Sequence, residues 1–496
     1  MDNLAVQDFN DLNYGSEVSG DYSRQDLEML YKAMSAGAIT GRETNNLLDA
    51  SGAPLKVESL ENTMKILTSS PKHTPFFVEM VKKPATNTIE EYNQLVSLGN
   101  FDGGFTEEGE LPEAVDSIYR RKAQKVKYFG MTGGVTLPMQ LVTTGSGISN
   151  MIAAEVKNKA QKLLELMERY VGFADERIIP QHFNGLLTQH ETESGYPTLS
   201  SYYSSDIVVD CGGSVLTTEH IEHGVATSLE NLGLADTLIG PPAVFSNFVT
   251  RYHSNTRILP VPQMVRDGVF GQRVNEIITQ NGGVRILQSN FFRNGLPRIA
   301  TQPASSPKAP TAPTTVTASA VNSSFSKIRT SEIGDYYYGV TAVNRFGESP
   351  LTLVSAIVSP IAGQAVDLTI TPSVGSAYAP TGFNIYKTVV DAPNNAVKFY
   401  KVLSVPVASL ATGFDGGAAG VVRDNFYHMP ATDQAWMPEW DGDQVFAFKQ
   451  LAPMMKVNLA VTGQISRFMV LLYGTPILYA PMKTIRFINI GRTLPS

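Results

Sequence analysis

Cysteine is almost absent from this chain of 496 residues, which contains only Cys211. A single cysteine excludes an intramolecular disulfide framework, so we expect a reducing compartment. The chain also lacks an uninterrupted apolar run of the roughly 20 residues that a membrane-spanning helix needs. The nearest approach, at 468–481, is interrupted by glycine and proline. We therefore expect no membrane span.

Two further absences concern the N-terminus and the sign of the charge. The first residues carry neither a basic n-region nor an apolar h-region, so we expect no secretory signal peptide. Positive charge does not dominate, because the formal net charge is −7. A body that holds nucleic acid by neutralising phosphates is strongly basic. That class of protein is excluded, although DNA can still be a neighbour.

What the chain does contain is ordinary globular material, with 43% hydrophobic and 17% charged residues. This length can form two or three hydrophobic cores. The first residues are polar and broken, which is typical of an arm rather than a domain. The changes of composition predict four segments, and their bounds are 1–60 for the arm, 61–300 for an α+β core, 301–428 for a β-rich insertion, and 429–496 for a return to the core.

The clearest single element is a helix at 151–171. Apolar residues recur there every three or four positions, at Ile152, Val156, Ala160, Leu163 and Met167. Lys157 and Lys162 fall outside this stripe. We also predict a helix near 219–232, another after the Gly-Pro-Pro signal at 240–242, and a strand at 283–288. Together these elements predict a mixed α and β domain.

The β-rich insertion has a different texture. Its proline-rich start, 302–316, favours extended, poorly packed chain and marks a boundary. Short alternating runs follow, at 335–344, 365–372, 382–388 and 398–405. The run YYYGVTAVNRFGESP resembles a late strand and turn of a fibronectin type III or Ig-like module, and GFNIYKT resembles another strand. The resemblance implies an Ig-like β-sandwich.

Between 106 and 130 the charges are sorted by sign. A projecting loop cannot bury a core of its own, and opposite charges on successive segments steer and register a contact with another chain. A solvated hairpin on a free surface is the alternative. The residues that we predict to form an inter-subunit contact are Glu107, Glu108, Glu110, Glu113, Asp116, Arg120, Arg121, Lys122, Lys125 and Lys127.

The order of these elements resembles the major capsid proteins of tailed bacteriophages, which have the Hong Kong 97-type fold. The similarity covers roughly 60–300 and 430–496 and ends in YGTPILYAPMKTIRFINIG. It implies an N-terminal arm, an extended β loop, a spine helix, and peripheral and axial domains. On this chain the extended loop falls at 90–130, the spine helix at 151–171, and much of the axial domain at 217–295.

Patterns that suggest chemistry are weak. His220 and His223 lie three apart on one helical face, but no third ligand has a recognisable spacing. Cys211 has no Cys/His motif around it, so a structural thiol is the simpler interpretation. We therefore predict no catalytic, cofactor-binding or metal-binding residues, no cofactor, and a protein that is not an enzyme.

Two classes of function are consistent with these patterns. The resemblance implies a major capsid protein that assembles into hexamers and pentamers of an icosahedral head around double-stranded DNA, with the Ig-like domain displayed outside. The partners would then be further copies of the chain, scaffold, portal and decoration proteins, and packaged DNA in non-specific contact. The chain would belong to the virion and assemble in the bacterial cytoplasm. The alternative is a surface adhesin, or a polysaccharide-active enzyme with a fibronectin-like accessory module.

Overall fold

The computed structural model describes residues 73–99, 116–141, 150–194, 207–252 and 275–492, except 355, 374, 376, 394–397 and 461–462. These ranges all belong to one compact unit. The predicted N-terminal arm lies outside the described residues, as do Glu107, Glu108, Glu110 and Glu113.

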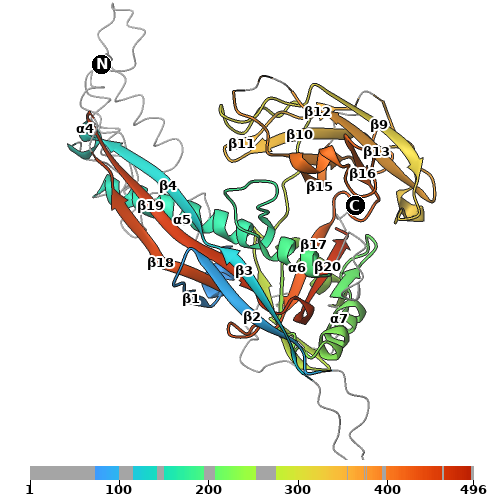
Figure 1. Ribbon diagram of the computed structural model, residues 1–496, viewed down its shortest axis with the longest axis horizontal. Helices are drawn as coiled ribbons and strands as arrows, with labels where there is room; N and C mark the ends of the chain where they lie inside the picture. The colour runs from blue at the N-terminus through green and yellow to red at the C-terminus, as the bar shows by residue number, and fades with distance from the viewer. Residues whose placement is uncertain are drawn as a thin grey trace, which may run out of the picture. The chain divides into compact units, whose positions relative to one another are not determined.

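The predicted long helix is present as α5, Met151–Phe173 (Figure 1). Asn150 caps its start, because the side-chain oxygen accepts a hydrogen bond of 3.1 Å from the amide of Ala153. Leu163, Met167 and Val171 are fully buried on one face, while Lys157 and Lys162 are exposed on another. The apolar spacing therefore predicted both the helix and its buried face.

Helix α5 packs on a four-stranded sheet with the order β1, β18, β19, β4. The strands are β1 (Lys82–Pro84), β4 (Lys127–Thr136), β18 (Phe446–Asn458) and β19 (Ile465–Leu478). Short helices at its margins are α3 (Pro75–Glu79), α4 (Leu137–Leu141) and α6 (Leu186–Ser194). The sheet joins residues near position 130 to residues near 470, so this core needs both ends of the described chain.

A fully buried carboxylate connects α5 with α3. Glu168 accepts the backbone amides of Phe76 at 3.0 Å and Phe77 at 2.7 Å, one on each of its oxygens. These amides lie in the first turn of α3, where a helix has donors without intrahelical partners. Burial, which outweighs these bonds, raises the pKa of Glu168.

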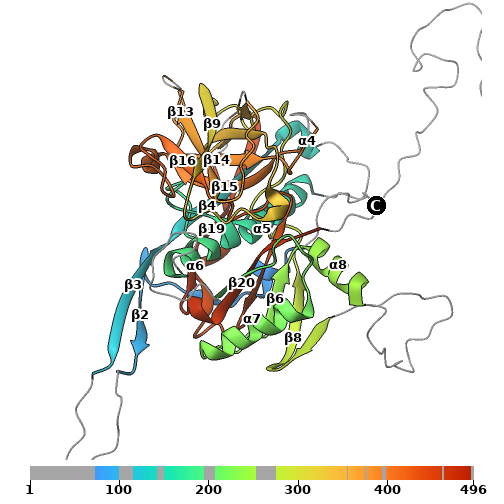
Figure 2. The ribbon, with the colours of Figure 1, turned by 90° about the vertical axis from the view of Figure 1, so that its right-hand side faces the viewer.

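A second core surrounds a six-stranded sheet with the order β5, β20, β17, β6, β8, β7. Its strands are β5 (Val208–Asp210), β6 (Thr237–Gly240), β7 (Glu276–Thr279), β8 (Gly282–Gln288), β17 (Asp433–Pro438) and β20 (Thr484–Ile490). The two predicted helices are α7 (Thr218–Glu230) and α8 (Pro242–Tyr252). Figure 2 shows α7 running along this sheet, and Ile221 and Val225 belong to its core.

The β-rich segment forms two sheets around a third core. One contains β10 (Tyr338–Asn344), β11 (Gly347–Glu348), β12 (Thr352–Leu353), β14 (Gly382–Lys387) and β15 (Tyr400–Pro406). The other contains β9 (Thr315–Asn322), β13 (Gln364–Thr371) and β16 (Val421–Asp424). Both sheets contribute buried residues to one cluster, including Val340 and Leu368. We call this segment the sandwich.

The proline-rich stretch before the sandwich is better packed than predicted. Pro310 and Pro313 are buried. The side-chain amide of Asn344 donates to the carbonyl of Lys308 at 3.1 Å, and the amide of Thr314 donates to the carbonyl of Thr371 at 3.0 Å. The prediction of poorly packed chain therefore fits 302–309, where most residues are exposed, but not Pro310 and Pro313, which are packed beside the sandwich's sheets.

Candidate assembly surfaces

The segment predicted as an extended loop begins and ends as a two-stranded ribbon. Strands β2 (Ile89–Ser97) and β3 (Ile118–Lys125) pair antiparallel, with Leu95 opposite Tyr119 and Tyr92 opposite Lys122. Among the described strands no third one joins them, and Figure 2 shows the pair running away from the sheets. A two-stranded hairpin is marginally stable by itself. We call β2 and β3 the ribbon.

The base of the ribbon is fixed to the body of the chain. Glu90 is buried and lies 3.6 Å from the ammonium of Lys449 on β18. The ring of Tyr92 meets Tyr479 edge to face, with centroids 5.2 Å apart. The side-chain amide of Gln94 also donates to the carbonyl of Tyr479. The ribbon thus leaves the body at a defined place.

Several of the predicted basic residues have acidic partners within the chain. Lys127 and Lys125 lie 2.8 and 3.7 Å from a carboxylate oxygen of Glu176, and Arg121 lies 3.4 Å from Glu91. The sequence did not reveal these partners, because they depend on strand register and on the loop after α5. Arg121, Lys125 and Lys127 therefore form ion pairs within their own subunit.

Arg120 and Lys122, two more of the predicted basic residues, lie close together on β3. Partial burial, and then the nearby guanidinium of Arg120, lower the pKa of Lys122 to about 8. Asp116, at the start of this second strand segment, is exposed. The four glutamates predicted as their counterparts lie outside the described residues, so the predicted contact between acidic and basic segments stays a prediction.

Exposed apolar side chains on the ribbon were missed by the charge pattern. Tyr119 is 71% exposed and its cross-strand partner Leu95 is 53% exposed, so one cross-strand pair presents apolar surface to solvent. The large apolar residues exposed on the ribbon and at its distal end are Ile89, Leu95, Val96, Leu98, Ile118 and Tyr119. Strands with apolar residues on both faces and no core to bury them could have been noticed in the sequence.

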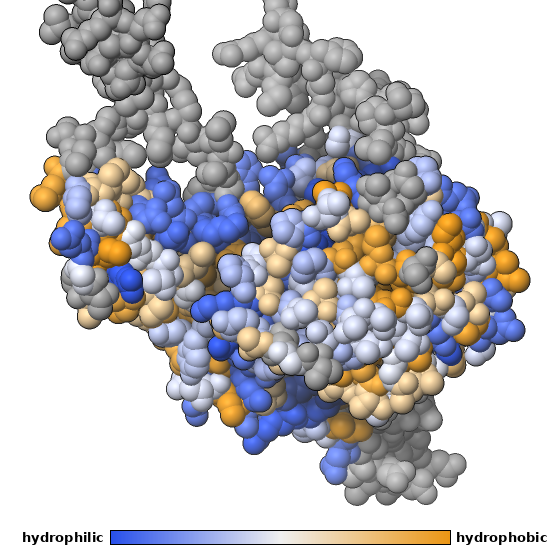
Figure 3. All heavy atoms as spheres, turned by 90° about the horizontal axis from the view of Figure 1, so that it is seen from above, coloured by the Kyte–Doolittle hydropathy of each residue, from blue (hydrophilic) through white to orange (hydrophobic). Residues whose placement is uncertain are grey.

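Figure 3 shows hydrophobic residues gathered in several patches among hydrophilic ones on the face that it presents. Single exposed apolar residues are normal on a soluble surface, whereas a gathered set indicates a contact site. The ribbon gathers six such residues within 89–98 and 118–119, which marks it as a candidate for a contact with another chain.

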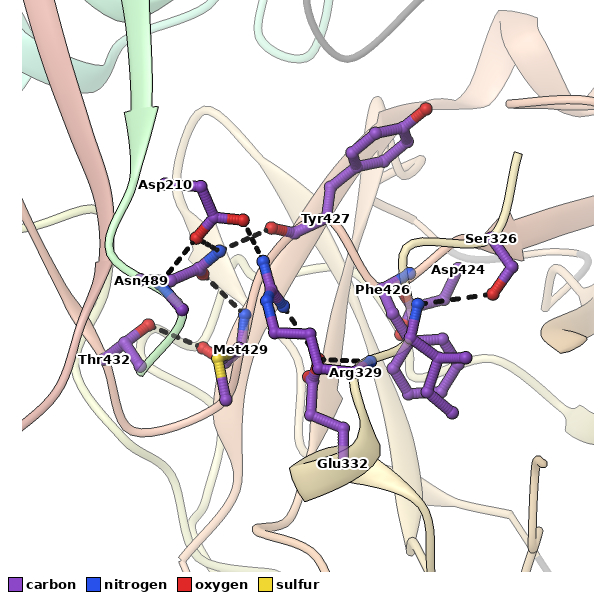
Figure 4. A network of polar contacts seen from close by, with 12 residues as sticks. Asp210, Ser326, Arg329, Glu332, Asp424, Phe426, Tyr427, Met429, Thr432 and Asn489 are labelled. Carbon is purple, nitrogen blue, oxygen red and sulfur yellow. Dashed lines mark hydrogen bonds and ion pairs between the residues drawn. The ribbon is translucent and has the colours of Figure 1, made fainter. Parts of the chain in front are cut away.

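A polar network joins the sandwich to the six-stranded sheet (Figure 4). Arg329 forms ion pairs with Asp210 at the end of β5 and with Glu332 in the short helix Thr330–Glu332, the latter at 2.7 Å. Asn489 donates to Asp210 and to the carbonyl of Tyr427, both at 2.9 Å. Through these contacts Arg329, Glu332 and the carbonyl of Tyr427 are connected to Asp210 and Asn489 of the six-stranded sheet.

The residues weighed for chemistry have structural roles. Burial raises the pKa of the Cys211 thiol to about 12, which leaves it protonated and unreactive. His220 forms part of the capping box at the start of α7 with Thr217. In the ranges that the structure describes, no group of three histidine, cysteine or carboxylate side chains is placed to hold a metal ion. None of the described helices has both the length and the apolar character that crossing a bilayer requires.

No family model matches the chain, but full-length relatives are found. It is 24% identical over 483 residues to the major capsid protein of Staphylococcus phage K, which covers 96% of this chain and 97% of that protein. It is 23% identical over 474 residues to the putative major capsid protein of Enterococcus phage phiEF24C, covering 94% of this chain and 97% of the relative. The likeness therefore includes the ribbon, the sandwich and both cores.

Solved structures with a similar course of the chain include the capsid of a native GTA particle and the capsid of cyanophage P-SCSP1u. Their TM-scores are 0.44 and 0.43, at 7% and 8% identity, and they cover 90% and 92% of this chain and 98% and 97% of theirs. Because these scores are below 0.5, the assignment rests on the sequence relatives. Those relatives favour the shell-forming class over an adhesin or an enzyme.

Proposed function

We infer that this chain is a tailed-bacteriophage major capsid protein with the Hong Kong 97-type fold. We propose that its ribbon is the element that holds neighbouring subunits together. The protein forms the hexamers and pentamers of an icosahedral head. In that head the ribbon of one subunit lies on the body of the next. Its apolar residues are buried there, and the basic residues of β3 meet acidic residues of the neighbour.

The observation that carries this proposal is the exposed apolar pair Leu95 and Tyr119 on a ribbon without a core. Burying apolar surface contributes roughly 25 cal/mol per Å². A partner that covers both side chains therefore supplies the stability that the two strands lack by themselves. The fixed base of the ribbon supports the same function, because an element that leaves the body at a defined place reaches a defined neighbour.

The remaining surfaces suit the two sides of a shell. We place the sandwich on the outside, where a segment with its own hydrophobic core adds no requirement to the contacts between bodies. Lys157, exposed on α5, is available to packaged DNA on the inside. Such a contact is non-specific, since a single exposed lysine reads no bases. Scaffold, portal and decoration proteins are further partners of the same assembly, which takes place in the bacterial cytoplasm.

The test replaces the apolar pair and examines assembly. The double variant Leu95→Ser, Tyr119→Ser should be expressed as a folded, soluble subunit, because neither side chain belongs to a core. Shells should be lost or reduced at least tenfold in yield, as judged by sedimentation and negative-stain electron microscopy. The unchanged protein should form closed shells or capsomers under the same conditions.

The matched control is Ile361→Ser on the sandwich, where the side chain is 59% exposed, similar to Leu95. This variant should assemble normally, because we place the sandwich outside the contacts between bodies. Normal shells from the ribbon variant would contradict the proposal. Loss of shells in both variants would show that assembly responds to any loss of exposed apolar surface and not to the ribbon.

A further inference from the structure

The core of the sandwich contains a charged pair that the capsid function does not use. Lys387 ends β14 and Asp424 ends β16, so the two residues belong to the two opposite sheets. The ammonium nitrogen of Lys387 lies 3.0 Å from Oδ2 of Asp424, and Lys387 is 0% exposed. A lysine with no access to solvent is rare, because removing its charge from water is costly.

Aromatic rings and fixed donors enclose this pair. The Lys387 nitrogen lies 4.0 Å from the ring centroid of Phe426 and 5.4 Å from that of Tyr336. Tyr338 donates its hydroxyl to Oδ2 of Asp424 at 3.0 Å, and the amide of Phe426 donates to Oδ1 at 2.9 Å. Both carboxylate oxygens are therefore held in place, and the rings exclude water from the nitrogen.

The backbone is strained where it places the ring over the lysine. Phe426 has a φ of +62°, in the left-handed region that is unfavourable for a residue with a side chain. Such strain persists only where the surroundings hold it. Here it turns the chain after Asp424 so that the amide of Phe426 meets the carboxylate and its ring covers the nitrogen.

A second acid lies in the same region of the core. Glu332 is 2% exposed, and its Oε2 binds Arg329 at 2.7 Å. In the described part of the chain, its Oε1 is buried without a hydrogen-bond partner. The hydroxyl of Tyr336 donates to the backbone carbonyl of Glu332 at 2.7 Å, and the ring of Tyr336 also lies beside the Lys387 nitrogen, so Glu332 and the ion pair contact the same tyrosine.

We propose that Lys387 and Asp424 form an isopeptide bond within the subunit, which joins the two sheets of the sandwich covalently. A proton passes from the ammonium to the carboxylate, which gives a neutral amine and a carboxylic acid. The amine nitrogen then attacks Cγ of Asp424. A C–N bond forms, the C–OH bond breaks, and the hydroxyl leaves as water with a proton from the nitrogen. The reaction is a condensation and needs neither an oxidant nor a reductant.

The structure holds the two reacting groups in contact, which does not happen when they are free in water. Holding two groups in contact is equivalent to an effective concentration of roughly 10⁵–10⁸ M. Tyr338 and the amide of Phe426 donate to the oxygens on which negative charge develops. Glu332 carries protons from the attacking nitrogen to the leaving hydroxyl.

The experiment is the intact mass of the purified full-length protein under denaturing conditions. Formation of the bond removes one water molecule, so the mass should be about 18 Da below the mass calculated from the sequence. Tryptic digestion should give one branched peptide in which Lys387 is not cleaved and is joined to Asp424. A mass equal to the calculated one, with both peptides found unlinked, would overturn the proposal.

Three variants assign the roles, each after circular dichroism has shown that it is folded. Lys387→Arg should have its full calculated mass, because a guanidinium does not attack the acid. Asp424→Asn should lose ammonia, about 17 Da, instead of water. Glu332→Gln should keep its full mass for at least tenfold longer than the unchanged protein. Loss of water from Glu332→Gln at the unchanged rate would remove Glu332 from the mechanism, and loss from Lys387→Arg would overturn the assignment.

Discussion

The body around α5 and the ribbon formed by β2 and β3 differ in whether their apolar side chains are buried within the chain. Leu163 and Met167 of α5 are buried by residues of their own chain, including Phe468 on β19. Leu95 and Tyr119 of the ribbon are exposed, and the ribbon meets the body through Glu90, Tyr92 and Gln94. By our proposal the body is stable before assembly, whereas the ribbon is stabilised by assembly.

Charged residues have different effects on folding in the body and on the ribbon. In the body, a charged residue is tolerated only with partners, as Glu168 shows with its two backbone donors. On the ribbon, an exposed ion pair such as Arg121 and Glu91 contributes little to the fold, at most about 1 kcal/mol. Substitutions in the body should therefore change folding, and those on the ribbon should change association.

The largest effect on folding is expected from Leu163→Asp. Leu163 is 2% exposed in the core beneath the four-stranded sheet. An unpaired carboxylate there should cost several kcal/mol, a large part of a typical domain's free energy of unfolding. The measurement is the soluble yield and the urea midpoint of the variant.

The matched control is the neighbouring exposed position, Lys162→Asp. Its side chain is 55% exposed and its ammonium lies 2.8 Å from Glu165, so the urea midpoint should change little. Equal stability of the two variants would mean that α5 has no buried face, and the comparison between body and ribbon would fail.

The next largest effect is a dependence on pH between 7 and 4 that comes from buried histidines of the body. Burial, followed by the charge of Arg486, lowers the pKa of His190 from 6.5 to about 3, and burial lowers that of His182 to about 4. The described strands of the ribbon contain no histidine. As the pH falls below about 6.5, the unfolded chain binds protons that the folded body does not. Stability that is present above pH 6.5 is therefore lost toward pH 4.

The measurement compares the unchanged protein with His190→Gln by urea unfolding between pH 7 and pH 4. The unchanged protein should lose up to about 1.4 kcal/mol per pH unit more than the variant. The gap between the two should therefore narrow as the pH falls. A gap that stays constant over this range would show that His190 titrates alike in the folded and unfolded states.

The smallest effect on folding, with the largest on association, is expected from reversing the charges of β3. The triple variant Arg120→Glu, Arg121→Glu, Lys122→Glu should change the free energy of unfolding less than Leu163→Asp does, because Arg121 is exposed and Arg120 and Lys122 are only half-buried. Shells should be lost, since like charges would then oppose each other across subunits. Circular dichroism and sedimentation give the two readouts.

A control for the triple variant is Lys157→Glu on α5, which removes exposed positive charge away from the ribbon. It should fold and form shells. Normal shells from the triple variant would leave the ribbon's charges without a function in association, and the apolar pair would then account for the contact alone.

The sequence predicted the elements whose pattern is local. The spacing of Leu163 and Met167 identified α5 and its buried face, because burial by a sheet selects one side of a helix. Glu168 could not be placed, since on the sequence it is one more polar residue of the helix. Its role depends on Phe76 and Phe77, which are 92 and 91 residues away.

The candidate site was predicted only in part for the same reason. The run of basic residues at 120–127 was visible, and so was its position in an extended segment. The pairing of Lys127 with Glu176 depends on how β4 lies beside the loop after α5, and Lys387 meets Asp424 only once two sheets face each other. Contacts between segments distant in the sequence follow from tertiary packing, which no local pattern encodes.

The position of β17 between β20 and β6 has a consequence for the order of events on the ribosome. Strands β6 and β8 are made early, but β17 follows only after the whole sandwich, from Asp433 onward. At about 5–20 residues per second, the stretch between Gln288 and Asp433 delays it by roughly ten seconds. During that time one edge of β6 has no neighbour, and an open edge invites pairing with another nascent chain. If the sandwich folds quickly, β17 can pair with β6 sooner after it is synthesised. The folding rate of the sandwich therefore affects how many subunits escape aggregation.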